Sequence, residues 1–333
     1  MINCFDVESL SVLQKYRFKQ TFLIGENVEE FIFDKPFVDE RLRASEYFLK
    51  DVQQGILSLE NFIKINKIKT FNELTKKRSM FAFECFETEN YEKKVSKECL
   101  PIFCRFILDR RLAKDGYFGD TQKFTQNNKE AILVTVYECN FVYETGLQNH
   151  YTTENFIQSL KYRFQPSFVY RSNCVYEFQH VIQIVHNLCN ENQYDLDGDL
   201  DKILGSDDFN VYYSVATEKE AFFIQILNLV SEKKGLNNFN SFDDLKMNFI
   251  DAMKQIGLFK SEQTFAIFED PLKKYFNSVS INESLSESDV KHVLKTIHSK
   301  NVEGVLKVSD ILKKMTNDEL RDEFKRFLRN GVK

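Results

Sequence analysis

Residues 131–143 read AILVTVYECNFVY and combine β-branched and aromatic side chains in one short run. Such residues suit the pleated, half-buried surface of a β-sheet, so the stretch predicts a strand, the clearest in the chain. A second strand is expected at residues 167–170, directly after Pro166, and a helix at 153–160. One helix and two strands do not establish a parallel α/β sheet, so we expect a small β element within a mainly helical protein.

On both sides of this element, apolar residues recur at steps of three and four, which is typical of amphipathic helices. Residues 38–113 predict such helices, including a basic one at 99–112 that a Lys-Asp-Gly turn at 114–116 would end. Further helices are expected at 174–190, at 217–232 behind a capping box of Thr217 and Glu220, and at 241–256 with Ser241 as cap and Gly257 as stop. The expected fold class is mainly α with a minor β part.

These patterns divide the chain into six regions. Residues 1–38 are a poorly specified N-terminal segment with strand-pair candidates at 20–24 and 31–33, and are followed by a helical region at 39–125, a small β-containing region at 126–173 and a helical region at 174–276. The run NSVSINESLSES at 277–288 predicts a linker, because Ser and Asn compete locally with regular backbone pairing. Residues 289–333 then form a separate module.

The module at 289–333 is expected to hold three short helices, the third opened by a capping box at 316–319 and closed by Gly331. This order resembles the beginning of a winged-helix or helix-turn-helix module, in which the third helix is the recognition helix. The exposed side of that helix would carry Arg321, Lys325, Arg326 and Arg329. No two-stranded wing follows, so a bare three-helix bundle is the alternative.

The composition favours a globular protein without a general attraction for polyanions. Apolar residues make up 43% of the 333 residues and 33 are Phe, so a large core can form. The net charge of -5 leaves nucleic-acid binding to a local patch. Seven cysteines, an odd number, and a start that lacks the form of a signal peptide predict reduced thiols in the cytoplasm or nucleus. No apolar run approaches the roughly 20 residues of a bilayer span, so no membrane partner is expected.

Four aspartates alternate around Gly198 in the stretch NENQYDLDGDLDK at 190–202, which raises the question of a calcium site. A calcium-binding loop needs oxygen ligands at alternate positions, glycine at the sixth position and glutamate at the twelfth. Counting from Asp195 puts Leu200 sixth and Ser206 twelfth, so the register fails. We expect an acidic solvated loop, in which Asp195, Asp197 and Asp199 are weak candidates for an irregular metal site.

Other patterns that carry chemistry are sparse. His180, His186 and Cys189 have no second ligand pair nearby, which favours core residues over a zinc site. P-loop, dinucleotide-binding, nucleophile-elbow and zincin motifs do not occur. Arg110 and Arg111, beside a GYFG turn at 116–119, are the best anion-binding candidates because guanidinium groups hold phosphates bidentately. A solvated helix end is the competing interpretation.

The chain is therefore expected to be a non-catalytic intracellular adaptor or a subunit of a larger complex, with protein partners and no cofactor. Two other classes stay open. One is a nucleic-acid-binding protein that uses Arg321, Lys325, Arg326 and Arg329, aided by Arg110 and Arg111. The other is an enzyme without a local motif that acts on a phosphorylated ligand near Arg110 and Arg111.

Overall fold

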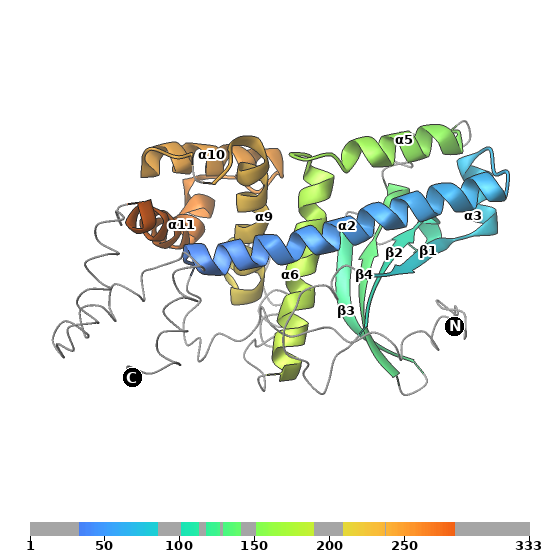
Figure 1. Cartoon of the computed structure of the whole chain (residues 1–333), viewed down its shortest axis with the longest axis horizontal. Helices are drawn as coiled ribbons and strands as arrows, with labels where there is room; N and C mark the ends of the chain where they lie inside the picture. The colour runs from blue at the N-terminus through green and yellow to red at the C-terminus, as the bar shows by residue number, and fades with distance from the viewer. Residues whose placement is uncertain are drawn as a thin grey trace, which may run out of the picture.

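A computed structural model describes residues 33–85, 101–112, 118–126, 129–140, 151–189, 209–236 and 238–283. In this part of the chain the fold is α+β, mostly helical with one four-stranded mixed sheet (Figure 1). The sheet lies at one end of the molecule and a group of helices at the other, and one long helix runs past both. The expected helical character with a minor β part is confirmed.

The elements follow one another along the chain in a simple order. They are α2 (Lys35–Ile65), α3 (Phe71–Lys77), β1 (Met80–Glu84), β2 (Ile102–Ile107), the 3₁₀ turn η2 (Arg110–Leu112), β3 (Gly119–Gln126), β4 (Lys129–Val136), α5 (Thr153–Arg163), α6 (Val169–Cys189), α8 (Phe209–Ser214), α9 (Ala216–Lys234), α10 (Phe242–Gln255) and α11 (Glu262–Glu283).

The sheet has the strand order β1-β2-β4-β3, in which β2 and β4 are parallel and both outer pairs are antiparallel. β4 lies largely within the stretch 131–143 and confirms the strand predicted there as far as Val136. Its parallel partner β2 pairs Ile102 with Ile132. Both central strands are rich in apolar residues because both of their faces are buried.

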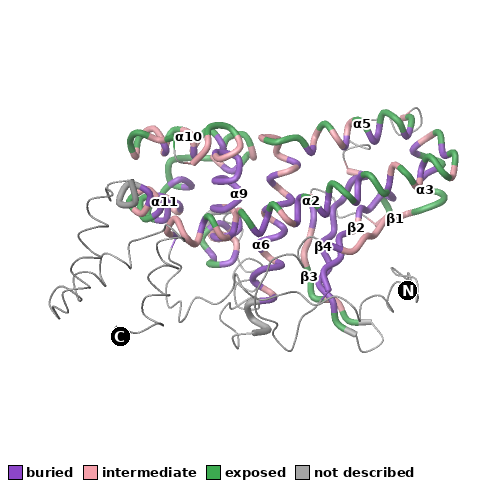
Figure 2. Tube along the Cα trace, in the orientation of Figure 1, coloured by how far each residue is buried: buried purple, intermediate pink, exposed green. Residues whose placement is uncertain are grey.

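Helix α2 crosses one face of the sheet closely enough to require a glycine. A Cβ atom on Gly55 would lie 2.3 Å from the ring of Phe83 in β1. Glycine inside a helix costs about 0.5–1 kcal/mol relative to alanine, and the ring packing offsets this cost. On the same face, Phe178 of α6 stacks on Phe48 of α2 with ring centroids 4.8 Å apart. Figure 2 shows the buried residues continuing along α2, α6, α9 and the strands as one core.

The other end of the molecule is helical and aromatic. Phe249 of α10 is fully buried, and its ring centroid lies 5.7, 6.4 and 6.1 Å from those of Phe223, Phe265 and Phe268. The predicted limits of α10 are confirmed: the Ser241 side chain accepts a hydrogen bond from Asp244 N at 3.2 Å, and Gly257 follows the helix with a φ of 76°. Helix α2 also begins here, where Lys35 N donates to Ser278 Oγ of α11 at 2.7 Å.

Two secondary-structure predictions are wrong. The helix expected at 99–112 is strand β2 followed by η2, and the strand expected at 167–170 is the entry to α6. In β2 every residue except Arg105 is buried, so the apolar run lacks the alternation that would identify a strand. At the second site, Ser167 adopts a positive φ of 67° and turns the chain into the helix.

Two predicted boundaries also differ from those in the structure. The capping box expected at Thr217 and Glu220 does not form, because α9 begins at Ala216 with Val215 as its N-cap and Glu220 turns inward. The linker expected at 277–288 begins inside α11, which continues to Glu283. The strand-pair candidates at 20–24 and 31–33, apart from Phe33, and the module at 289–333 lie outside the described residues.

The cysteines that the structure places behave as reduced core residues. Cys85, Cys104, Cys139 and Cys174 are buried and are not joined in disulfides. Burial raises the pKa of each thiol, which keeps it protonated and poorly reactive. None of the described helices combines the length and the hydropathy that a bilayer span requires.

Candidate functional site

Six polar side chains converge where α6 meets β3, α8 and α9. They are Thr121 of β3, Tyr176, Glu177 and His180 of α6, Tyr212 of α8 and Glu218 of α9, here named the acid–base cluster. On α6 the polar residues are one, three and four positions apart, so Glu177 and Tyr176 each lie about one turn from His180. The cluster therefore joins four elements through side chains that can hold or release protons.

Glu177 points from α6 toward the edge strand β3 and is buried. The Thr121 hydroxyl donates to its Oε2 at 2.8 Å. Gly119 permits this approach, because a Cβ atom there would lie 3.0 Å from Glu177 Oε1 and 2.5 Å from the Thr135 carbonyl oxygen. Burial raises the pKa of Glu177 to about 7, although His180 and the Thr121 hydrogen bond act in the opposite direction. This carboxyl group titrates near neutrality.

His180 lies about one helical turn further along α6. Its Nδ1 is 2.9 Å from Gln183 Oε1, and Gln183 Nε2 donates to the Thr217 carbonyl at 2.8 Å. Because the Gln183 oxygen faces the ring, Nδ1 carries a hydrogen, while Nε2 faces the Glu218 carboxylate at 3.7 Å. Burial disfavours the imidazolium form, but Glu218 and Glu177 outweigh it and raise the pKa of His180 above its ordinary value.

Two tyrosines complete the cluster. The hydroxyl oxygens of Tyr176 and Tyr212 are 2.8 Å apart, and the Tyr176 hydroxyl donates to the Glu218 carboxylate in a short hydrogen bond. The Tyr176 ring meets the ring of His180 edge to face, with centroids 4.8 Å apart. Burial first, and then the charge of Glu218, raises the pKa of both phenols, so both remain neutral hydrogen-bond donors.

The acid–base cluster is made of groups that can exchange protons. Carboxyl, imidazole and phenol groups are the usual general acids and bases of enzymes. Here the chain itself occupies them: Thr121 binds Glu177, Gln183 and Glu218 bind His180, and Tyr176 binds Glu218. A network of this kind fixes the relative orientation of the elements that it joins. The cluster therefore ties α6 to β3, α8 and α9 through groups that are wholly or partly removed from water.

Two further buried charge pairs link α5 and α6 to the segment after β4, and α2 to α9. Glu138, after β4, accepts hydrogen bonds from Tyr170 of α6 and, at 3.0 Å, from Arg163 of α5. Arg41 of α2 pairs with Glu220 of α9 at 3.0 Å, with side-chain exposures of 5% and 0%. Among the side chains that the structure places, no group of three His, Cys, Asp or Glu is arranged to hold a metal ion. Glu138 and Glu220 are thus each paired with an arginine.

The anion-binding candidates Arg110 and Arg111 lie in η2, directly after a strand and not at the end of a helix. Arg111 Nε is 3.1 Å from both carboxylate oxygens of Asp109, and the Arg111 backbone N donates to Oδ1 at 3.0 Å. The hydrogen bond from the Arg111 side chain lowers the pKa of Asp109. A phosphate at this guanidinium would have to compete with Asp109, although 87% of the Arg111 side chain is exposed.

The remaining candidates from the sequence lie outside the described side chains. They are Arg321, Lys325, Arg326 and Arg329, the aspartates Asp195, Asp197 and Asp199, and the zinc candidates His186 and Cys189. The third zinc candidate, His180, is placed, and it belongs to the acid–base cluster.

Sequence reasoning does not assemble the acid–base cluster, because its members come from four separate segments. One signal is present on α6, where Glu177, His180 and Gln183 recur at every third residue among apolar residues such as Val181 and Ile182. Polar groups on a buried helix face need partners, so this spacing indicates a polar seam. It does not identify Thr121 or Glu218 as those partners.

Similarity to known proteins assigns no family to the chain. No protein-family model matches it, and neither the curated proteins nor the solved structures yield a significant match.

Proposed function

We propose that the protein is a non-catalytic intracellular adaptor, or a subunit of a larger complex, that works through protein–protein contacts. The observation that carries this proposal is the 64% exposure of Tyr162 on α5. Its ring meets the ring of Phe168 edge to face with centroids 4.8 Å apart, so two aromatic side chains form one apolar spot. Tyrosine is enriched among the residues that dominate binding energy at interfaces.

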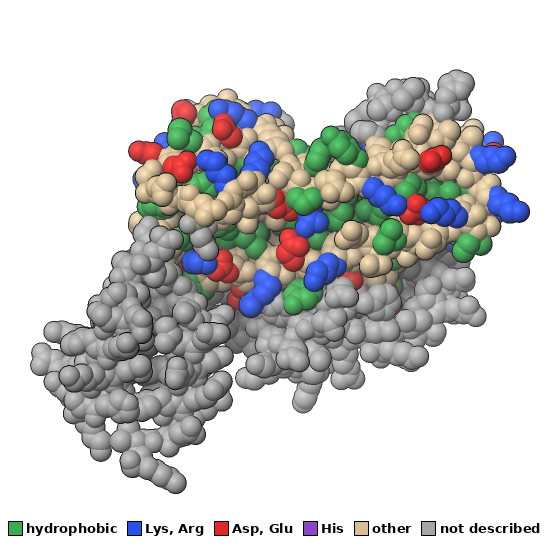
Figure 3. Space-filling view, turned by 45° about the horizontal axis from the view of Figure 1, so that its top comes forward, with side chains coloured by type: hydrophobic (Ala, Val, Ile, Leu, Met, Phe, Trp, Pro, Cys, Tyr) green, Lys and Arg blue, Asp and Glu red, His purple; other side chains and the backbone are tan. Residues whose placement is uncertain are grey.

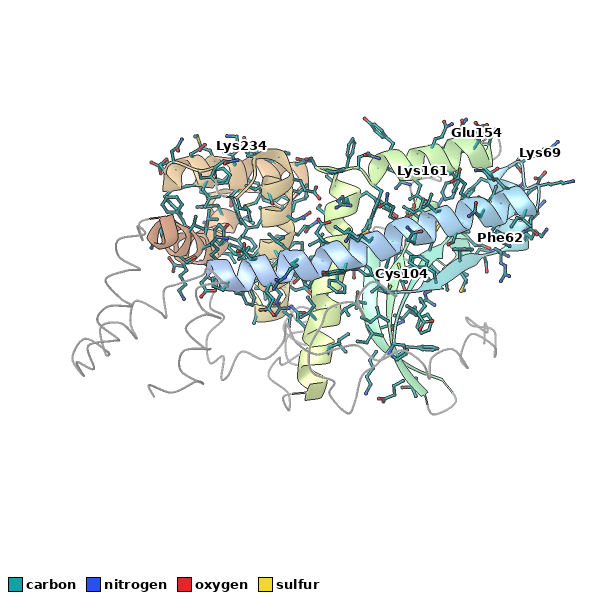
Figure 4. All side chains as sticks on the ribbon, viewed as in Figure 1. Phe62, Lys69, Cys104, Glu154, Lys161 and Lys234 are labelled. Carbon is teal, nitrogen blue, oxygen red and sulfur yellow. The ribbon has the colours of Figure 1, made fainter. Side chains whose placement is uncertain are left out.

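The neighbouring helix α2 is joined to α5 by an ion pair and carries one partly exposed leucine. Lys161, adjacent to Tyr162, pairs with Glu60 of α2 at 2.6 Å, and Leu57, one turn before Glu60, is 37% exposed. Figure 3 shows apolar side chains interspersed with charged ones on this side of the molecule, and Figure 4 shows Lys161 on α5 beside α2. An apolar centre with a charged rim is the common form of a protein interface. Leu57, Tyr162 and Phe168 are named the α2–α5 surface.

An adaptor needs a second contact surface. We place it in residues 289–333, which we propose form a three-helix, winged-helix-like module with Arg321, Lys325, Arg326 and Arg329 on one side. Basic side chains on one helix suit an acidic partner surface, because complementary charge steers association.

Recovery of partner proteins with the tagged full-length chain tests the α2–α5 surface. Tyr162→Ser removes its aromatic centre, and Met247→Ser, at a residue 61% exposed on α10, is the matched control. We expect a partner that the wild type and Met247→Ser retain and that Tyr162→Ser binds about 30-fold more weakly, since a central tyrosine contributes about 2 kcal/mol. Both variants should keep the wild-type melting temperature because the replaced side chains are exposed.

Two results would contradict the adaptor function. One is a chain that stays monomeric and recovers no partner from native extract at its natural abundance. The other is a rise in melting temperature with a nucleotide or a phosphate ester, which would favour an enzyme that acts near Arg110 and Arg111. Arg321→Gln combined with Arg326→Gln in the same assay tests the second surface, where loss of a different partner is expected.

A further inference from the structure

The end of the molecule farthest from α11 is strongly basic. Residues 64–78 contain six cationic side chains and one carboxylate, Glu73, in a chain whose net charge is -5. All six cations are exposed; they are Lys64, Lys67, Lys69, Lys76, Lys77 and Arg78, here named the basic tip. Figure 3 shows Lys and Arg side chains gathered at this end, and Figure 4 shows Lys69 projecting from it.

The fold holds the basic tip in a defined shape. Lys67 takes a positive φ of 52° in the turn after α2, and Thr70 then caps α3. Phe71 is fully buried against Phe156 of α5, with ring centroids 4.9 Å apart, and its backbone N donates to the Tyr151 carbonyl at 2.9 Å. The turn is therefore anchored to α5, and its cations are presented on a rigid support.

The one carboxylate in the segment is used by the backbone. Glu73 Oε2 accepts hydrogen bonds from Lys69 N at 2.8 Å and from Thr70 N at 3.3 Å, and these bonds lower its pKa. Of the basic-tip cations, Lys64 pairs with Glu60 at 3.0 Å and Arg78 lies over the ring of Phe62 at 5.4 Å. No ion pair to a described residue engages Lys67, Lys69, Lys76 or Lys77. The charges of Lys69 and Lys76 also lower the pKa of Glu73, but all four lysines remain exposed to solvent.

The residue types indicate which polyanion fits. Five of the six cations are lysines, which contact phosphates as point charges and do not form the bidentate forks that read bases. The aromatic residue in the segment, Phe71, is buried, so the tip lacks a platform on which single-stranded bases would stack. The phosphate backbone of a duplex can be bound by lysines as point charges and requires no stacking on bases, so a duplex suits the basic tip.

A membrane surface fits less well. Ile65 is 80% exposed, but one aliphatic side chain gives little apolar area for insertion, and stable membrane binding takes more than one anchoring signal. A planar anionic membrane would also face the acidic remainder of the chain, whereas a rod-shaped duplex can touch the tip alone.

We propose that the basic tip binds the phosphate backbone of double-stranded nucleic acid without reading its sequence. This proposal does not rest on the adaptor function.

Anisotropy of a labelled duplex of about 20 base pairs, titrated with the full-length protein at several salt concentrations, tests the proposal. Each neutralised phosphate contributes about -0.9 to the slope of log K against log salt, so we expect a wild-type slope of about -4. The variant Lys69→Gln/Lys76→Gln/Lys77→Gln should flatten the slope by about 3 and weaken binding at least about 10-fold at low salt.

A matched control separates the tip from general electrostatics. Lys254→Gln/Lys260→Gln/Lys273→Gln changes the net charge equally at exposed residues on or beside α10 and α11, and should leave affinity and slope unchanged. Equal losses in both triple variants would overturn the proposal, as would the absence of wild-type binding at low salt. Tighter binding to single strands or to phosphatidylserine vesicles would also overturn it. Loss with Arg321→Gln/Arg326→Gln but not with the tip variant would transfer the site to the last helix.

Discussion

The residues that pack on the two sides of α9 differ in type. On the side that faces α10 and α11, Phe223 meets the ring of Phe249 and the aromatic group around it. On the side that faces α2 and α6, Glu220 pairs with Arg41, and Gln225 donates to Asn173 Oδ1 at 2.6 Å. The first half is packed around aromatic rings, whereas the second half combines an apolar core with polar pairs removed from water.

The two halves contribute differently to the native state. Buried rings gain about 25 cal/mol per Å² of apolar surface on leaving water, and this gain does not depend on pH. Buried charges lose their hydration, and their mutual attraction offsets only part of this free-energy cost. Such pairs therefore add little net stability, whereas a buried charge that lacks its partner is strongly destabilising. We therefore expect the aromatic half to supply stability and the polar half to select which elements meet.

The largest effect is expected in the aromatic half. Phe249→Ala removes a fully buried ring and leaves a cavity, which should lower the free energy of unfolding by about 4 kcal/mol. Denaturant titration should give the same loss at every pH between about 5 and 8. Met247→Ala, on an exposed side of the same helix, should change stability by less than about 0.5 kcal/mol. A loss that varied with pH would show that the aromatic half is coupled to the titrating groups of the polar half, which would contradict the distinction between them.

A smaller effect is expected when one charge of a buried pair is removed. Glu220→Ala leaves Arg41 buried without its carboxylate partner and should cost about 3 kcal/mol in the free energy of unfolding. The double variant Arg41→Met/Glu220→Leu should recover most of this loss, because it removes the charge along with its partner. Asp251→Asn, which breaks the exposed pair with Lys254, should cost less than about 0.5 kcal/mol. A double variant no more stable than Glu220→Ala would show that the attraction itself stabilises the polar half.

The smallest effect is expected in the pH dependence of the polar half. Burial raises the pKa of Glu177 from 4.5 to about 7, so between these values the native state binds more protons than the unfolded state. The contribution of Glu177 is therefore fully present below about pH 4.5 and is lost as the pH rises through about 7. The raised pKa of His180 acts in the same direction, because its contribution is lost as the pH rises through its native value above 6.5.

Glu177→Gln removes one of these titrations while keeping an oxygen that can accept from Thr121. Its stability should equal that of the wild type near pH 5 and exceed it by about 2 kcal/mol near pH 8. Thermal or chemical unfolding at a series of pH values measures the difference. A wild-type stability that increased from pH 5 to pH 8, or a constant difference between the two proteins, would remove the acid–base cluster as the cause.

Local signals in the sequence predict local structure well. Ser241 and Gly257 mark the two ends of α10 correctly, because a cap and a left-handed stop involve residues close together in the chain. The central strand β4 was predictable for the same reason. Strand β2 was not, since burial on both faces removes the alternation of polar and apolar residues. The capping-box prediction at Thr217 fails because Glu220 gains a long-range partner, Arg41, that a sequence window does not contain.

The candidate site depends on these long-range pairings. The sequence shows that α6 carries Glu177, His180 and Gln183 at regular spacing, but Thr121 and Glu218 reach them only through the register of β3 and the packing of α9. Arg110 and Arg111 were identified as neighbours, while the engagement of Arg111 by Asp109 follows from a strand ending that the sequence had suggested to be a helix. The basic tip was not identified from the sequence, because its cations are interspersed with apolar and polar residues over positions 64–78; the anchoring of Phe71 that presents them together is shown only by the fold.

The length of α2 has a consequence for synthesis of the chain. This helix has 31 residues, about 46 Å, and packs against β1 near its end and against α11 at its start. Its first residue bonds Ser278, 243 residues later, and at about 5–20 residues per second that partner leaves the ribosome on the order of 10–50 s after Lys35. Until then the start of α2 lacks its contact with α11, so we expect the packing of this helix to be completed only after Ser278 has left the ribosome.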